Sequence, residues 1–314
     1  MLNRRHIRIK VMQTLYAFKG NESDDIKKDE KFLLNSLEGM YDLYLVMMSL
    51  MIEIQKKAED HLRKSQKKLL ATAEEKNPNE RFINNEVLLA IKNNVPLKME
   101  LESRKIDNWY LDFEYVDILH KAIIESDVYA EYMANPDSNF NLDKQLVVEI
   151  FSKIIAPNEK LYEYIEDKNL TWIDDLPVVN TAMLKLLKKV KPSSPETHFV
   201  PDLYKDEEDK EFAVTLFRKT LLNGSKLNEE ISSKTKNWDS ERITSIDAVL
   251  MRMAISEFLY FSSIPVKVTI NEYLEIAKEY STPKSSIFIN GILDKLVKEY
   301  KEDNKLNKIG RGLM

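Results

Sequence analysis

The sequence predicts an all-α protein, and three observations lead to that prediction. The chain of 314 residues contains only six glycines and ten prolines, whereas folds built from strands and tight turns need glycine where φ is positive. Apolar residues recur at intervals of three and four along most of the chain, which is the period of an amphipathic helix. Short Asn–Pro and Pro–Ser breaks separate these stretches. We therefore expect two helical bundles packed together, with an enlarged N-terminal helical part.

The composition excludes several classes of function. Hydrophobic residues make up 43% and charged residues 32%, which is typical of a globular protein with a heavily charged surface. The absence of cysteine removes thiolate nucleophiles, disulfides and thiolate zinc sites. The four histidines show no metal-ligand spacing, so we expect no metal and no cofactor. We find neither a membrane-spanning apolar run nor a secretory signal, and so expect a cytoplasmic protein.

The first predicted helix covers residues 4–19, and Gly20-Asn21 is expected to end it. Arg5, Arg8 and Tyr16 fall on one face, which we expect to be exposed. Guanidinium groups pair with phosphate and aromatic rings stack on unpaired bases, so this face has the chemistry of an RNA contact. A merely solvated basic face is the alternative. Four apolar residues would form the buried stripe of the helix: Ile7, Val11, Leu15 and Phe18.

Charge is concentrated at the two ends of the chain. The formal net charge is −5, yet no acid precedes Glu22 and none follows Asp303. An acidic body with two basic ends suggests a localised contact with a polyanion. The cations of the two ends are Arg4, Arg5, Arg8, Lys10 and Lys19, then Lys305, Lys308 and Arg311.

The region 21–205 is predicted to be helical after a polar loop. A long helix is expected over 32–76, a shorter one over 79–95 with a stop at Val95-Pro96, and an aromatic-rich helical stretch over 109–134. Four methionines within 40–51 fall at helical spacing, which favours core packing over a partner surface.

An internal repeat links this region to the next. The stretch 143–184 matches 209–250 at a constant offset of 66 residues. A duplicated helical hairpin would explain the match, and so would two amphipathic hairpins that converged on one pattern. The most informative pairs are Asp143 with Asp209, Phe151 with Phe217, and Trp172 with Trp238.

A linker rich in proline and serine, 191–207, precedes five further predicted helices. These cover 209–222 and 225–236, and then begin near Thr244, at Ser263-Ile264-Pro265, and at Thr282, which would be an N-cap followed by Pro283. The segment 303–314 is expected to be a basic disordered tail.

Motifs at both ends of the chain resemble the NusB family of transcription antitermination factors. The opening Arg4-Arg5-His6-Ile7-Arg8 runs into Gln13-Thr14-Leu15-Tyr16. The closing half contains Asp247-Ala248-Val249-Leu250-Met251-Arg252, then Ile264-Pro265-Val266-Lys267-Val268-Thr269-Ile270-Asn271-Glu272, then Phe288-Ile289-Asn290-Gly291-Ile292-Leu293-Asp294-Lys295. The resemblance implies a NusB-like fold in which 1–20 is the basic N-terminal helix and 206–302 the C-terminal bundle. The segment 21–205 is then a family-atypical addition.

The resemblance also implies a function. It points to a non-enzymatic protein that binds a boxA-type single-stranded RNA together with NusE, a small-subunit ribosomal protein, in the RNA polymerase antitermination complex on ribosomal RNA operons. Tyr16 and Asp247 match positions that the family places on or near the protein partner. A helix N-terminus in the turn 282–286 would add backbone donors for a phosphate, although the family usually has acids where this chain has Pro283-Lys284. The residues expected to hold RNA are Arg4, Arg5, Arg8, Thr282, Lys284 and Ser285.

Two other functions fit parts of the sequence. A helical interaction scaffold that has kept the NusB fold without RNA binding would explain the acidic net charge and the long addition. An RNA cytosine methyltransferase with a NusB-like domain would need a glycine-rich cofactor loop and a nucleophilic cysteine, and the chain has neither. Within the last motif, Gly291 costs a helix about 1 kcal/mol relative to Ala, so we expect it to permit a close helix crossing.

Overall fold

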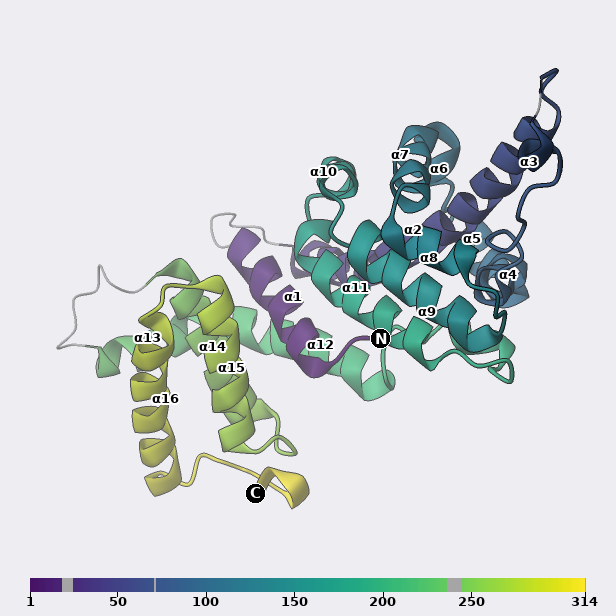
Figure 1. Ribbon diagram of the computed structural model, residues 1–314. Helices are drawn as coiled ribbons and strands as arrows, with labels where there is room; N and C mark the ends of the chain where they lie inside the picture. The colour runs from purple at the N-terminus through teal and green to yellow at the C-terminus, as the bar shows by residue number, and fades with distance from the viewer. Residues whose placement is uncertain (19–24, 71, 236–243, 314) are drawn as a thin grey trace. The chain divides into compact units, whose positions relative to one another are not determined.

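The computed structural model describes residues 1–18, 25–70, 72–235 and 244–313, and every regular element in these ranges is a helix (Figure 1). The all-α prediction is therefore confirmed. The chain forms two compact units. The first combines Met1–Leu37 with Leu203–Met314, and the second is the continuous segment Glu38–Asp202.

The first unit joins the start of the chain to its closing helices. α1 (Arg4–Ala17) packs against α12 (Glu207–Leu222) and α14 (Ser245–Tyr260), although about 200 residues separate them in sequence. Asn3 begins α1 by accepting a hydrogen bond from the His6 backbone N–H, and the His6 side chain completes the capping box. Gly20-Asn21, the predicted end of this helix, lies outside the described residues. The unit is completed by α13 (Gly224–Lys234), α15 (Val266–Tyr280), α16 (Ser285–Glu302) and the short 3-10 helix η4 (Gly310–Leu313).

The second unit is built around α2 (Ile26–Gln66), whose first residues belong to the first unit. The four methionines of this helix, at positions 40, 47, 48 and 51, are buried, so the core interpretation is confirmed. Its other elements are α3 (Ala73–Lys76), α4 (Glu86–Asn93), α5 (Val95–Ser103), α6 (Asn108–Leu111), α7 (Phe113–Ile124), α8 (Asp127–Ala134), α9 (Phe140–Ile150), the π-helical turn η1 (Phe151–Ile155), α10 (Glu159–Lys168), α11 (Trp172–Lys189) and the 3-10 helix η2 (Glu196–Phe199).

One predicted helix boundary in this unit was wrong. Val95-Pro96 was expected to stop a helix, but it begins α5, because Asn94 caps the Leu97 backbone N–H and proline is tolerated in a first turn. The stretch 109–134 is helical as expected and is divided into three helices; Ser126 starts the last of them by accepting from the Tyr129 backbone N–H.

The helix boundaries fit the sequence repeat over its first two helices. Moved by 66 positions, α9 with η1 would cover 206–221, and α12 covers Glu207–Leu222. In the same way α10 would cover 225–234, and α13 covers Gly224–Lys234. Asp143 and Asp209 are both buried, and each binds the first residue of a neighbouring helix: Glu86 of α4 in one case and Arg4 of α1 in the other. Trp238 lies outside the described residues, so its equivalence to Trp172 stays a prediction.

The end of the chain differs from the expected disordered tail. The Lys308 ammonium donates hydrogen bonds to the carbonyls of Glu257 and Phe261, at 3.3 and 2.8 Å, and the Ile309 N–H donates to the carbonyl of Ser262. The last carbonyls of a helix have no partner within it, and a cation is favourable there. The end of α14 therefore provides a docking point for this segment.

Candidate nucleic-acid interface

The three arginines predicted to hold RNA are all ion-paired with acids of the closing helices. Arg4 donates from Nε to Asp209 at 2.9 Å. Arg5 makes two hydrogen bonds to Glu272, at 2.9 and 2.8 Å. These two side chains keep 34% and 41% of their surface exposed, so both remain accessible to a ligand.

Arg8 does not lie on an exposed face, and that expectation was wrong. Its side chain is 3% exposed and makes two hydrogen bonds, of 2.8 and 2.7 Å, to the fully buried carboxylate of Glu257. The guanidinium also lies over the rings of Phe212 and Tyr273, each within 6 Å of the ring centre. Helical spacing showed which residues share a face with Arg8, but it did not show that α12, α14 and α15 cover that face.

The buried Glu257 carboxylate is hydrogen-bonded by more than Arg8. Thr269 donates to it at 2.7 Å and the Tyr273 hydroxyl at 3.2 Å. Burial alone would lower the pKa of Arg8, but the charge of Glu257, its hydrogen bonds with Arg8, and the nearby Tyr273 and Glu272 together outweigh burial and raise it. Burial, with the nearby Glu257, raises the pKa of Tyr273. Arg8 thus stays charged, and its hydrogen bonds to Glu257 are made inside the bundle.

Glu272 is the second acid that orients the basic helix. Hydrogen bonds from Arg5, helped by the charge of Arg8, hold the pKa of Glu272 below its ordinary value although burial opposes this. Arg8 itself lies 3.6 Å from the Glu272 carboxylate. Burial and the neighbouring Arg5 lower the pKa of His6, so His6 adds little positive charge at neutral pH.

Asp247, predicted to face a protein partner, is instead buried at the start of α14. Ser281 and Ser285 donate to its two carboxylate oxygens at 2.7 and 2.9 Å. The prediction that Thr282 is the N-cap of the last helix was wrong: α16 begins at Ser285, and Thr282 instead accepts the Ser285 backbone N–H in a tight turn that contains Pro283. Asp247 therefore holds this turn in place through the hydrogen bonds that it accepts from the two serines.

The turn and the arginines lie at opposite ends of α14. Asp247 and Glu257 are ten residues apart, which is about 15 Å along a helix. α1 starts beside the end of α14, because Arg4 and Phe261 both contact Phe212. Since Arg8 pairs with Glu257, α1 then runs back towards the start of α14, and Tyr16 lies towards the end that carries the turn. The two predicted RNA contacts are thus parts of one unit, but they do not form one pocket.

Several positions between and beside these ends are open to solvent. Tyr16 is 49% exposed, and Thr282 and Lys284 are exposed in the turn. On α16, Ile287 is 76% exposed and Gly291 has open space where a Cβ would stand. The expected close helix crossing at Gly291 is therefore absent, and that prediction was wrong.

Glu257 was the main functional residue that the sequence did not indicate. From the sequence alone, Glu257 cannot be told apart from an acid on the surface of α14. Its only signal was a position next to Phe258 on a buried face, at a spacing where an apolar residue is expected. The partners are 249 and 267 residues away from Arg8 and Arg5, a separation at which one sequence gives no pairing information.

The arrangement defines a helical binding protein with an ion-paired basic surface. Across the described residues, no three His, Asp or Glu side chains gather as a metal site would require. No helix in the described ranges is both long and apolar enough to cross a membrane.

Comparisons with known proteins agree with this class. The model of the NusB family matches residues 181–298. The chain is 43% identical over 112 residues to the transcription antitermination protein NusB of Salinibacter ruber, which is 36% of this chain and 70% of that protein. It is 43% identical over 113 residues to the protein of the same name from Chloroherpeton thalassium, a match that covers 36% of this chain and 54% of that protein. It is 41% identical over 98 residues to the protein of the same name from Natranaerobius thermophilus, a match that covers 31% of this chain and 66% of that protein. No solved structure matches the chain. The chain belongs to the NusB family.

Proposed function

We propose that this protein is a non-enzymatic transcription antitermination factor that binds a boxA-type single-stranded RNA together with NusE. In this proposal it works in the cytoplasm, within the RNA polymerase antitermination complex on ribosomal RNA operons. The additional helical region, expected over 21–205, takes no part in the RNA contact in this proposal; the family match begins within it, at residue 181.

One observation carries the proposal: the basic helix is bound to the helices that match the family. α1 lies outside the matched range 181–298, yet Arg4, Arg5 and Arg8 pair with Asp209, Glu272 and Glu257 inside it. The basic opening is thus part of the same bundle as the family motifs rather than a free extension.

The ion pairs leave donors for a phosphate. A guanidinium has five N–H donors in a planar fork, and Glu272 uses two groups of Arg5. The remaining donors of Arg5 and Arg4 are held in fixed positions by the acids behind them, and this reduces the entropy lost on binding. Arg8, with 3% of its surface exposed, positions Glu257 and Glu272 instead of touching RNA.

The turn at the far end of α14 supplies the other contacts. Thr282 and Lys284 are exposed and would reach phosphate oxygens, while Ser285 is buried on Asp247 and holds the turn in place. We infer that Tyr16 contacts NusE, and its half-exposed ring, towards the end that carries the turn, supports this. A strand of RNA that touches both ends would cross about 15 Å of α14.

The test is a titration of the full chain with a labelled boxA-type single strand and with a scrambled strand of equal composition, each with and without NusE. The double variant Arg4→Ala, Arg5→Ala should bind more weakly, and the slope of log affinity against log salt should fall by about 1.4, at about 0.7 per lost phosphate contact. Lys153→Ala, Lys160→Ala is the matched control, because these lysines are also exposed and ion-paired but belong to the second unit.

The contribution of Tyr16 is tested separately. Tyr16→Ala should weaken binding of NusE but leave the salt slope of RNA binding unchanged, because the ring carries no charge that pairs with phosphate.

The helical scaffold without RNA binding is the second candidate, and the neutralisation of all three arginines by acids favours it. If the double variant of Arg4 and Arg5 is folded and keeps the wild-type affinity and salt slope, RNA does not bind there. The scaffold function would then replace the proposal.

A further inference from the structure

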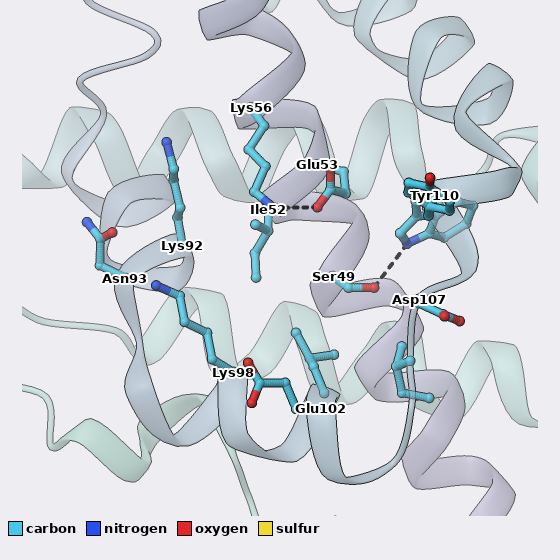
Figure 2. A pocket seen from close by; sticks show the side chains of 13 residues that line it. Ser49, Ile52, Glu53, Lys56, Lys92, Asn93, Lys98, Glu102, Asp107 and Tyr110 are labelled. Carbon is cyan, nitrogen blue, oxygen red and sulfur yellow. Dashed lines mark hydrogen bonds and ion pairs between the residues drawn. The ribbon is translucent and has the colours of Figure 1, made fainter.

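The second unit carries an open pocket that the proposed function does not use. It has a volume of about 560 Å³ and lies between α2, α4, α5 and α6 (Figure 2). Its lining includes the apolar side chains of Ile52, Leu101 and Ile106. Trp109 is fixed in its wall, because the indole N–H donates to the Val46 carbonyl and to the Ser49 hydroxyl, at 3.1 and 3.0 Å. The pocket is therefore a preformed apolar hollow.

Large apolar side chains are exposed on the helices that border the pocket. On α5, Val95 and Met99 are 59% and 64% exposed, and on α6, Tyr110 and Leu111 are 85% and 77% exposed. Tyr110 lines the pocket, and Val95 borders a separate hollow. Single exposed apolar residues are common, but several on two neighbouring helices indicate a surface that another molecule covers.

α5 also carries two charges that pair with nothing in the described part of the chain. Lys98 and Glu102 line the edge of the pocket one turn apart, and no ion pair joins them (Figure 2). The other lysines of the pocket behave differently: Lys56 pairs with Glu53 at 2.7 Å, and Lys92 with Glu59 at 2.6 Å. An unpaired base and an unpaired acid, four residues apart on one helix, are the charges that an antiparallel copy of the same helix would satisfy.

We propose that this face of the second unit binds the same face of a second copy of the chain, with α5 packed against α5 in antiparallel orientation. A two-fold interface must be self-complementary, since each residue meets a different residue of the other copy and the reverse contact also occurs. Lys98 opposite Glu102 makes two identical ion pairs and fixes the register of the two helices.

The same register brings exposed apolar side chains together. Positions 95, 98, 99 and 102 share one face of α5, whereas position 101 lies about 200° round the helix from position 99. Where position 98 faces position 102, the two-fold axis passes level with position 100, so the exposed and flexible Met99 of one copy lies beside Met99 of the other. One register thus satisfies the charges and covers exposed apolar side chains of α5.

The charges around the pocket favour a protein occupant over RNA. Glu53, Glu102 and Asp107 line it together with the lysines, and these carboxylates would repel phosphate groups. The dimer does not depend on the proposed contact between the first unit and RNA.

The experiment is sedimentation velocity of the full chain over a series of micromolar concentrations. The wild type should show a monomer–dimer equilibrium. Met99→Glu should be monomeric throughout, because it places a charge at the centre of the contact. Lys98→Glu and Glu102→Lys should each weaken dimerisation by about tenfold or more, since each juxtaposes like charges twice, and the double variant Lys98→Glu, Glu102→Lys should restore it.

The control exchanges the charges of a pair remote in sequence, Lys160→Glu with Glu163→Lys on α10, and should leave dimerisation unchanged. Circular dichroism of each variant checks the fold, which should be intact because the altered side chains are exposed. A wild type that stays monomeric at every concentration overturns the proposal and leaves the face to a different protein. A dimer that Met99→Glu does not weaken also overturns it, because the two copies then meet elsewhere.

Discussion

Arg8 and Glu257 show how a basic residue can serve the bundle rather than a ligand. The guanidinium is buried, both of its hydrogen bonds to Glu257 are short, and Thr269 and Tyr273 complete the shell of the carboxylate. Arg4 and Arg5, in the same helix, have similar partners but lie near the surface. Burial therefore separates residues that the sequence presents as one basic cluster.

We expect Arg8→Ala to lower the free energy of unfolding by about 3–5 kcal/mol, because it leaves the Glu257 carboxylate buried without a counter-charge. Arg5→Ala should cost about 1 kcal/mol or less, since its pair with Glu272 is partly solvated. Urea denaturation followed by circular dichroism measures both values. Equal effects of the two substitutions would contradict the structural role given to Arg8.

Gly291 is the other residue whose role changes with the structure. It lies inside α16, and no atom comes within 4 Å of the place where the Cβ of an alanine would stand. Gly291→Ala should therefore raise the free energy of unfolding by about 1 kcal/mol, seen as a higher melting temperature. A lower melting temperature would show that this position does need glycine within the fold.

The candidate site could be predicted only in part from the sequence. The basic cluster and the turn were located by their residue types, and Arg4, Arg5, Thr282 and Lys284 are accessible as expected. The burial of Arg8 and Asp247 was not foreseen, because it depends on helices more than 30 residues away in the chain.

At the scale of elements, the sequence predicted which stretches are helical better than it predicted where each helix begins and ends. Apolar residues three and four positions apart predicted α1, α12, α13 and α14 with boundaries within a few residues of those observed. Thr244 caps α14 as expected. The failures lie at prolines: Pro96 starts a helix and Pro283 sits in a turn before one. Proline suits both positions, so local sequence does not distinguish them.

α7 carries a buried histidine that should make the second unit sensitive to acid. His120 is 5% exposed and its ring lies edge-on to that of His61. Burial, with the charges of His61 and Lys57 and against that of Asp117, lowers the pKa of His120 to about 4. The unfolded chain, with an ordinary pKa of about 6.5, binds a proton between these values while the folded chain does not.

The free energy of unfolding should therefore fall by roughly 2–3 kcal/mol as the pH is lowered from about 6.5 to about 4. His120→Phe keeps a ring in place but cannot titrate, so its stability should fall less over this window. Urea denaturation at a series of pH values makes the comparison. Parallel pH profiles for the two proteins would show that His120 is not the group responsible.

At the scale of the whole molecule, the chain forms two units with separate cores. Leu15 of α1 is buried in the first unit and Leu161 of α10 in the second. Each substitution to alanine should cost about 2–5 kcal/mol through the cavity that it opens. In hydrogen–deuterium exchange, Leu15→Ala should speed exchange in α12, α14 and α15, whereas Leu161→Ala should speed it in α9 and α11. Faster exchange throughout the chain in either variant would indicate a single cooperative core.

The first unit is built from two separate stretches of the chain, and this has a consequence during protein synthesis. The second unit is one continuous segment and can fold as soon as Asp202 has left the ribosome, whereas α1 lacks its partners until the closing helices are made. Glu257 follows Arg8 by 249 residues, a delay of about 12–50 s at about 5–20 residues per second. For that time the apolar stripe of α1 is without its native cover on the nascent chain, and the second unit folds before the first unit, although the first unit contains the start of the chain.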